Sequence, residues 1–113
     1  MATVLTGAEK VVTLVSKELE TASAKLKDPR SLILYVWGSE GPRALVVAIC
    51  ESNLSVWARN PAGPGYEGIF QLGPTERAQY GAGDDARSQV EAAHRLFLAR
   101  GWEPWPVCAR GFM

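Results

Sequence analysis

The residues Pro42–Asn53, PRALVVAICESN, form the apolar segment around which the rest of this chain is organised. Proline suits the first position of a helix, and the apolar run after Pro42 predicts a buried helix with Glu51 near its end. Because burial disfavours the charged form of a carboxyl group, we expect the pKa of Glu51 to be raised. An acid that keeps its proton near neutral pH is suited to general-acid chemistry. The inward face of the helix is expected to hold Leu45, Val46 and Ile49.

Further helices are predicted on both sides of this segment. A capping box at Thr6 opens an amphipathic helix over residues 6–26, and residues 29–37 form an apolar helix before a turn at 38–41. Residues 74–80 read as a short helix. Asp84 or Asp85 caps a last long helix, which Gly101 ends. The inward face of this last helix is expected to hold Ala86, Val90, Ala93, Phe97 and Leu98.

The remaining segment, residues 53–73, is rich in Gly, Pro and Asn and predicts a loop or a short hairpin. The fold class is therefore α+β and mostly α. With 113 residues, of which 47% are apolar and 21% charged, the chain fits an ordinary globular domain. We divide it into an N-terminal helical extension, residues 1–28, and a domain, residues 29–113.

Charge and hydropathy exclude some classes of partner. The 12 basic and 12 acidic residues cancel, so a basic surface for nucleic acid is not expected. The apolar runs are shorter than the ~20 residues that span a membrane, so no membrane span is expected. The N-terminus has no basic leader, and charged residues from Glu9 to Glu18 interrupt it, so we expect no signal peptide in this chain. Either a leader has been removed or another route delivers the protein.

Three segments resemble, in their order along the chain, the lysozyme-like superfamily that cleaves peptidoglycan. They are Cys50–Ser52 (CES), Gly65–Leu72 (GYEGIFQL) and Gly101–Cys108 (GWEPWPVC). Together they look most like the resuscitation-promoting-factor domains, and Glu-Ser with Gly-Ile-Phe-Gln also looks like soluble lytic transglycosylases. The resemblance covers roughly residues 31–108. It implies a lysozyme-like fold with a cleft between two lobes.

The resemblance also implies an activity, the cleavage of the β-1,4 bond between N-acetylmuramic acid (MurNAc) and N-acetylglucosamine (GlcNAc), with Glu51 as the catalytic residue. In lytic transglycosylases a single glutamate protonates the leaving oxygen and then acts as base on the 6-hydroxyl of the sugar. This route is favoured because no second carboxylate is obvious. Glu67 is a second carboxylate, a substrate contact or an exposed turn residue, of which the last two are favoured, and Asp84 and Asp85 read as helix caps. The candidates for substrate binding are Ser52, Trp57, Asn60, Tyr66, Glu67, Gln71 and Trp105.

Several of these candidates have a purely structural alternative. Ser52 either hydrogen-bonds the acid or the substrate, or only ends the helix, and Gln71 either binds an acetamido or hydroxyl group or satisfies a turn. Trp57, Tyr66 and Trp105 are platforms for sugar faces or packing residues. Trp102 is assigned to the core, and His94 to the surface or the edge of the core.

The two cysteines, Cys50 and Cys108, are too few and too far apart in the sequence for a zinc site. We expect no metal and no cofactor. The cysteines are either two free buried thiols or, as the resemblance implies, a disulfide, which favours an oxidising compartment.

Two other functions stay open beside the transglycosylase. One is a hydrolytic muramidase, in which water attacks the sugar, and the other is a glycan-binding or structural module without turnover. We expect a monomer that acts on the glycan strands of bacterial peptidoglycan, either as an extracellular protein at the cell wall or as part of a phage virion.

Overall fold

The computed structural model describes residues 27–113, so the extension predicted for residues 1–28 lies almost entirely outside the described residues. Helices dominate the described part, and its sheet is one two-stranded antiparallel hairpin, which agrees with a mostly helical α+β class. In chain order the elements are α2 (Pro29–Trp37), η1 (Gly38–Glu40), α3 (Gly41–Ser52), β1 (Arg59–Asn60), β2 (Tyr66–Glu67), α4 (Pro74–Tyr80), α5 (Ala86–Arg100) and η2 (Arg110–Phe112).

The ends of the helices follow local signals in the sequence. Asp28 caps α2 by accepting a hydrogen bond from the Ser31 N–H, and Pro29 begins the helix. The cap of α5 is Asp85, whose side chain accepts from the Ser88 N–H at 2.7 Å. Gly101 ends α5 with a φ of 62°, a backbone conformation that glycine adopts without strain. The predicted bounds of these helices are thus confirmed.

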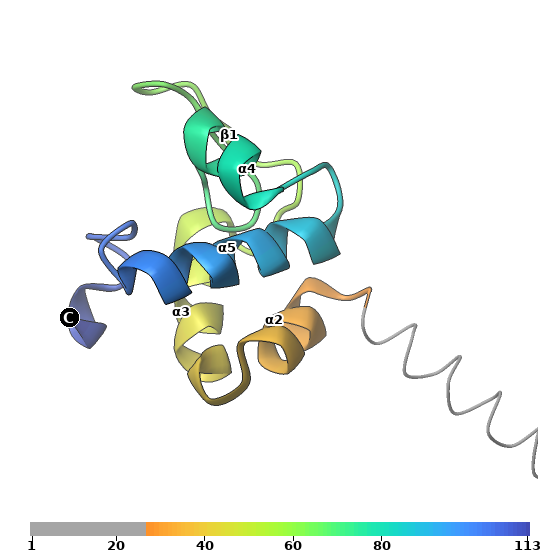
Figure 1. Ribbon diagram of the computed structural model, residues 1–113, viewed down its shortest axis with the longest axis vertical. Coiled ribbons are helices and arrows are strands. Elements are labelled where there is room, and N and C mark those ends of the chain that lie inside the picture. The colour runs from red at the N-terminus through yellow and green to blue at the C-terminus, as the bar shows by residue number, and fades with distance from the viewer. Residues whose placement is uncertain (1–26) are drawn as a thin grey trace, which may run out of the picture.

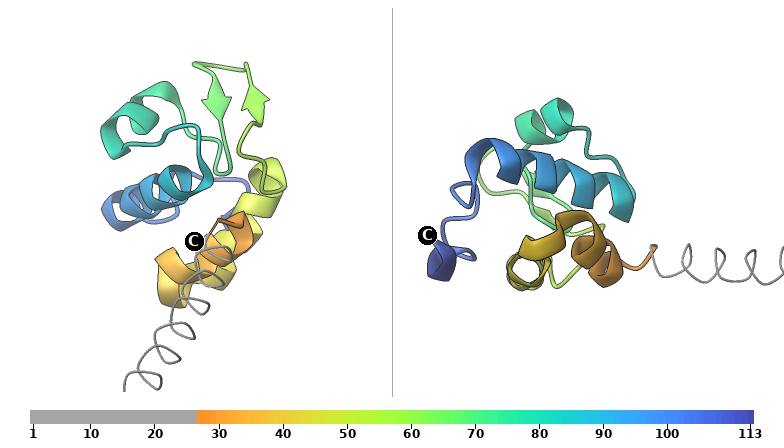
Figure 2. Two further views of the ribbon diagram at one scale, coloured as in Figure 1. Left: turned by 90° about the vertical axis from the view of Figure 1, so that its right-hand side faces the viewer. Right: turned by 60° about the horizontal axis from the view of Figure 1, so that its bottom comes forward.

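The long helix α5 lies in the middle of the fold. Figures 1 and 2 show α2 and α3 on one side of it and α4 with the hairpin on the other. The loop that follows the hairpin returns to the centre, where Ile69 and Phe70 are buried between the two sides. This arrangement leaves the end of α3, the hairpin, α4 and the end of α5 facing one another.

Trp37, at the end of α2, is the centre of an aromatic core. It is 3% exposed and stacks on Phe70, with ring centroids 5.3 Å apart, and on Trp102, at 5.8 Å. Aromatic side chains bury more area than other residues, so this cluster contributes strongly to the hydrophobic stabilisation of a small domain. The fully buried side chains around it are Leu32, Ile33, Val47, Ile69, Phe70, Val90 and Leu96.

Two predicted helix faces are confirmed in part: Leu45 of α3 and Ala86, Val90, Ala93 and Phe97 of α5 lie in or against the core, but three side chains predicted to face inward do not. Val46 and Ile49 are 53% and 40% exposed, and Leu98 of α5 is 70% exposed. In α3 the small side chains face inward, because close packing against α2 leaves little room: a Cβ at Gly41 would lie 3.0 Å from the Leu34 Cα. The residues that α3 buries are Gly41, Ala44, Val47 and Ala48, and those of α5 are Gln89, Val90, Ala92, Ala93 and Leu96.

The helical stretch Pro29–Ser52 is long and apolar enough, by length and composition alone, to cross a membrane. It is divided by the η1 turn, and its two helices, α2 and α3, pack against each other. Both helices place side chains in the core, among them Ile33 and Val47, which are completely buried. The stretch therefore serves as the core of this domain, and the expectation of no membrane span stays a prediction.

Candidate active site: a cleft beside Glu51

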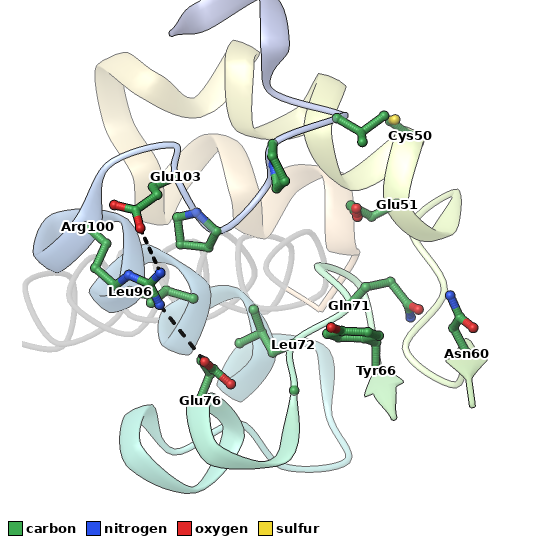
Figure 3. A pocket seen from close by; sticks show the side chains of 14 residues that line it. Cys50, Glu51, Asn60, Tyr66, Gln71, Leu72, Glu76, Leu96, Arg100 and Glu103 are labelled. Atoms are coloured by element: carbon green, nitrogen blue, oxygen red, sulfur yellow. Dashed lines mark hydrogen bonds and ion pairs between the residues drawn. The ribbon is translucent and has the colours of Figure 1, made fainter. Parts of the chain in front are cut away.

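A cleft with a volume of about 550 Å³ opens between the end of α3, the hairpin, the start of α4, the end of α5 and residues 103–107. Figure 3 shows its lining side chains. The cleft brings together predicted site residues that are far apart in the sequence, namely Cys50, Glu51, Asn60, Tyr66 and Gln71.

Glu51 lies in the last turn of α3 and lines the cleft with a partly buried side chain. Burial raises the pKa of this carboxyl group above its ordinary value, as the sequence predicts. Within residues 27–113 no Lys, Arg or His forms an ion pair with Glu51 that would oppose this shift. The group therefore keeps a proton more readily than a solvated glutamate, which suits a proton donor.

Ser52 connects the helix of Glu51 to the loop on the other side of the cleft. Its hydroxyl donates to the Ile69 carbonyl at 2.7 Å and accepts from the Ser55 N–H at 3.1 Å. Since the hydroxyl proton is used and Ser52 does not line the cleft, a direct role in substrate binding is not supported. Ser52 therefore ties the end of α3 to the loop that carries Ile69.

Gln71 is held in place by its own amide group. Its Nε2 donates to the carbonyls of Gly68, at 2.9 Å, and Ala58, at 3.2 Å, which also fixes the orientation of the amide. Both N–H groups are thus used inside the protein, and the amide oxygen is the part that can accept a hydrogen bond from a ligand. Gln71 thus has the turn role considered from the sequence and also lines the cleft, whereas its binding of a sugar group stays a prediction.

Asn60 and Tyr66 lie opposite each other in the hairpin and line the same end of the cleft. The Oδ1 of Asn60 accepts from the Ala62 N–H at 3.1 Å, so its NH₂ group remains as a donor. Tyr66 is 36% exposed and offers a ring face and a hydroxyl group. Together with Gln71 these side chains give the end of the cleft near Glu51 uncharged donors and acceptors, which match sugar hydroxyl and acetamido groups.

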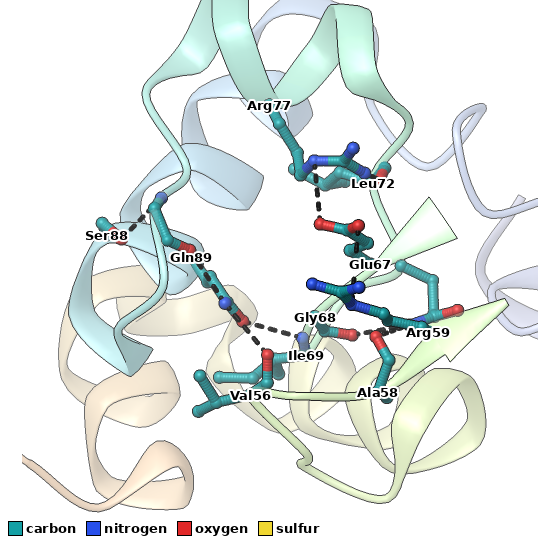
Figure 4. A network of polar contacts seen from close by, with 12 residues as sticks. Val56, Ala58, Arg59, Glu67, Gly68, Ile69, Leu72, Arg77, Ser88 and Gln89 are labelled. Atoms are coloured by element: carbon teal, nitrogen blue, oxygen red, sulfur yellow. Dashed lines mark hydrogen bonds and ion pairs between the residues drawn. The ribbon is translucent and has the colours of Figure 1, made fainter. Parts of the chain in front are cut away.

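Glu67 and Trp57 lie outside this cleft. Successive residues of a strand point to opposite faces, so Tyr66 faces the cleft and Glu67 faces away from it. Glu67 forms ion pairs with Arg59, at 3.7 Å, and Arg77, at 3.6 Å, as Figure 4 shows. Trp57 is 72% exposed and borders a small depression on the same side as Glu67. Neither residue is placed to contact a ligand beside Glu51.

Trp105 is a core residue, so its prediction as a sugar platform is wrong. Its side chain is 2% exposed, and its Nε1 donates to the Phe70 carbonyl at 2.9 Å. Because the side chain of Trp105 is buried and its N–H is already paired, no face of its ring is available to a sugar. Trp102 packs against the core as predicted, and His94 lies at the edge of the core with its ring centroid 5.2 Å from that of Trp37.

Cys50 and Cys108 form a disulfide, with their Cα atoms 5.7 Å apart. Of the two expectations for the cysteines, the bridge implied by the resemblance is confirmed. The bond joins the residue before Glu51 to the C-terminal segment, of which Pro104, Pro106 and Val107 line the cleft. It therefore holds one wall of the cleft against the end of α3.

The sequence reading did not single out the charged side chains at the other end of the cleft. Glu76 comes from the first turn of α4, Arg100 from the last turn of α5 and Glu103 from the segment after it. Each is an ordinary charged residue near a helix end, and the charges of Glu76 and Arg100 also suit the dipoles of their helices. No local signal marks them, and only their spatial convergence distinguishes them.

Among the described residues, no group of three or more His, Cys, Asp or Glu side chains could hold a metal ion. Comparisons with protein-family models, with curated proteins and with solved structures find no match for this chain.

Proposed function

We propose that this protein cleaves the β-1,4 bond between MurNAc and GlcNAc in peptidoglycan, with Glu51 as its catalytic residue. The observation that carries the proposal is the position of Glu51: a partly buried carboxyl group with a raised pKa lines an open cleft beside Asn60, Tyr66 and Gln71. Support also comes from the three sequence segments that resemble lysozyme-like enzymes, because they contain Glu51, both cysteines of the disulfide and the buried loop after the hairpin. We include the lysozyme-like fold in the proposal, supported by the mostly helical class with a small hairpin.

The proposed reaction is that of a lytic transglycosylase. Protonated Glu51 donates its proton to the glycosidic oxygen as the bond to C1 of MurNAc breaks, which releases the GlcNAc 4-hydroxyl. The 6-hydroxyl of the same MurNAc then attacks C1, and the Glu51 carboxylate takes the proton of that hydroxyl. The product is a 1,6-anhydro sugar, no water is consumed, and Glu51 returns to its starting state.

A hydrolytic muramidase is the second candidate, because Glu76 and Glu103 line the same cleft. In such an enzyme a second carboxylate acts as nucleophile or activates water. Both residues, however, form ion pairs with Arg100 and lie at the opposite end of the cleft from Glu51, as Figure 3 shows. This separation favours the mechanism that needs Glu51 alone.

Digestion of purified peptidoglycan followed by mass spectrometry tests the proposal. We expect muropeptides with anhydro ends from the wild type, and a loss of about 10²–10⁴-fold in rate for Glu51→Gln, the usual contribution of a general acid–base group. Glu67→Gln is the matched control, since it makes the same change on the face of the hairpin that points away from the cleft and disturbs only solvent-accessible ion pairs with Arg59 and Arg77.

The possible outcomes separate the candidates. Reducing ends in place of anhydro ends would identify a muramidase. Binding to peptidoglycan without any new chain ends would identify a glycan-binding module, and wild-type turnover in Glu51→Gln would refute the assignment of the catalytic residue.

The proposed function also implies a location for the protein outside the bacterial cytoplasm. Peptidoglycan lies outside the bacterial cytoplasm, and the disulfide of Cys50 and Cys108 is of the kind that persists in oxidising compartments. Both an extracellular enzyme at the cell wall and a virion component that meets the wall from outside satisfy these conditions.

A further inference from the structure

The cleft has two ends of different chemical character. Near Glu51 the lining side chains of Asn60, Tyr66 and Gln71 are uncharged, whereas Glu76, Arg100 and Glu103 form a charged end on the other side (Figure 3). Leu72 and Leu96 also line the cleft and lie between these ends in the same view. A ligand that fills the whole cleft therefore meets hydrogen-bonding groups at one end and charges at the other.

Arg100 keeps hydrogen-bonding capacity at the charged end. Its Nη2 donates to Glu103 at 3.1 Å, but its Nη1 is 4.0 Å from Glu76, which is too long for a hydrogen bond. A guanidinium group carries five N–H donors in a fixed plane, and this plane matches a carboxylate. The side chain is 44% exposed, so an incoming carboxylate can reach it.

The charged end also has an excess of negative charge, because two carboxylates face one guanidinium. Glu103 is the most accessible of the three, with 74% of its side chain exposed. Such a site favours a ligand that presents a carboxylate to Arg100 and an ammonium group to Glu103. An uncharged sugar forms no ion pair with either the Arg100 guanidinium or the Glu103 carboxylate.

We infer that the charged end of the cleft binds the peptide stem of peptidoglycan, and that Arg100 and Glu103 determine specificity for glycan strands that carry stems. The inference rests on the proposed function. The glycan backbone is uncharged, and the charges of this polymer lie on the stems, which are attached to the lactyl group of MurNAc and carry carboxylate and ammonium groups. The uncharged end of the cleft then takes the sugars at the cleaved bond, and the charged end takes the stem of a neighbouring sugar.

The test compares two substrates, namely peptidoglycan with intact stems and the same strands after an amidase has removed the stems. We expect the wild type to cleave the intact strands at least several-fold faster. Arg100→Ala should lower kcat/KM on intact strands by about tenfold, the effect of losing one hydrogen bond to a charged group, and should reduce the preference for intact over stripped strands by the same factor. Arg87→Ala is the matched control, because Arg87 lies on the same helix and pairs with Glu91 outside the cleft.

Equal rates of the wild type on both substrates would overturn the inference and leave the proposed function standing. If neither substrate is cleaved, the proposed function fails, and a binding measurement decides the inference separately. For this we use NMR titration of the folded wild-type protein with a tripeptide that ends in a diamino acid. Shifts of the Arg100 and Glu103 signals in the wild type, with the Glu103 shift lost in Arg100→Ala, support stem binding, and a wild-type titration without shifts at these residues refutes it.

Discussion

The hydroxyl of Ser52 donates a hydrogen bond of 2.7 Å to the backbone carbonyl of Ile69. The bond joins the last residue of α3, directly after Glu51, to the loop that carries Gln71 two positions further on. It therefore ties the end of α3, which carries the proposed acid, to the loop whose Gln71 is proposed to accept a hydrogen bond from the substrate.

Substitution of Ser52 tests this relationship. Ser52→Ala leaves the Ile69 carbonyl without its partner, whereas the Ser55 N–H keeps the Ser52 carbonyl as acceptor, and the free energy of unfolding should fall by about 1–3 kcal/mol. Turnover should fall by more than the loss of folded protein explains, because a small displacement of a catalytic group is costly. Denaturant unfolding and initial rates measure the two effects, and Ser52→Thr, which keeps the hydroxyl, should restore both. A destabilised Ser52→Ala with wild-type turnover would show that Ser52 does not position Glu51.

Glu51 should weaken the fold as it ionises. Its pKa is raised above the ordinary 4.5, so the folded state binds the proton more tightly than the unfolded chain. This contribution to stability is complete below the unfolded pKa and is lost as the pH rises through the folded pKa. We therefore expect Glu51→Gln, which cannot ionise, to have a higher Tm than the wild type at pH 7 and a smaller advantage at pH 4. An advantage that grows towards pH 4 would contradict the direction of the shift.

Gln71 should matter for stability as well as for activity. Its amide joins Ala58 to Gly68, so Gln71→Ala should cost about 1–2 kcal/mol in unfolding free energy and also lower turnover. Gln79→Ala, on the exposed side of α4, is the matched control and should stay near the wild type in both measurements. Unchanged stability in Gln71→Ala would argue against the role of its amide in the loop.

The tryptophans Trp57 and Trp105 should behave in opposite ways. Trp105→Ala empties a buried site and should cost about 3–5 kcal/mol in denaturant unfolding. Trp57→Ala changes an exposed side chain outside the cleft and should shift stability by less than about 0.5 kcal/mol, with near wild-type rates on soluble glycan fragments. A strong loss of rate in Trp57→Ala would mean that the substrate extends around the hairpin.

The disulfide should contribute strongly to stability. Replacing both Cys50 and Cys108 by serine should lower the free energy of unfolding by roughly 4 kcal/mol according to the loop-entropy model. Alkylation of the native protein before and after reduction, followed by intact-mass measurement, should show two labels only after reduction. Labelling of both thiols in the unreduced native protein would contradict the bridge.

Local signals were enough to predict the helices and the place of Glu51. The first turn of a helix depends on residues within reach of its own backbone, so Pro29, Asp85 and Gly101 mark helix ends wherever the chain lies. The raised pKa of Glu51 follows in the same way, because the apolar sequence before it already implies burial. The disulfide was anticipated from the order of the resembling segments.

Properties that depend on a partner far along the chain could not be predicted in this way. Apolar periodicity leaves open which side of α3 meets α2, and close packing selected Ala44 over Val46 for the inside. Composition could not separate Trp105, which has Phe70 as its partner, from the exposed Trp57.

The charged end of the cleft is the clearest example of a feature that local sequence does not predict. Glu76 and Arg100 come from different helices, and nothing in their own sequence surroundings brings them together. Their meeting requires α4 to pack on α5, which depends on the whole core. Local sequence therefore specified the elements and the proposed acid, whereas the shape and charge of the cleft arise from contacts between segments distant in the chain.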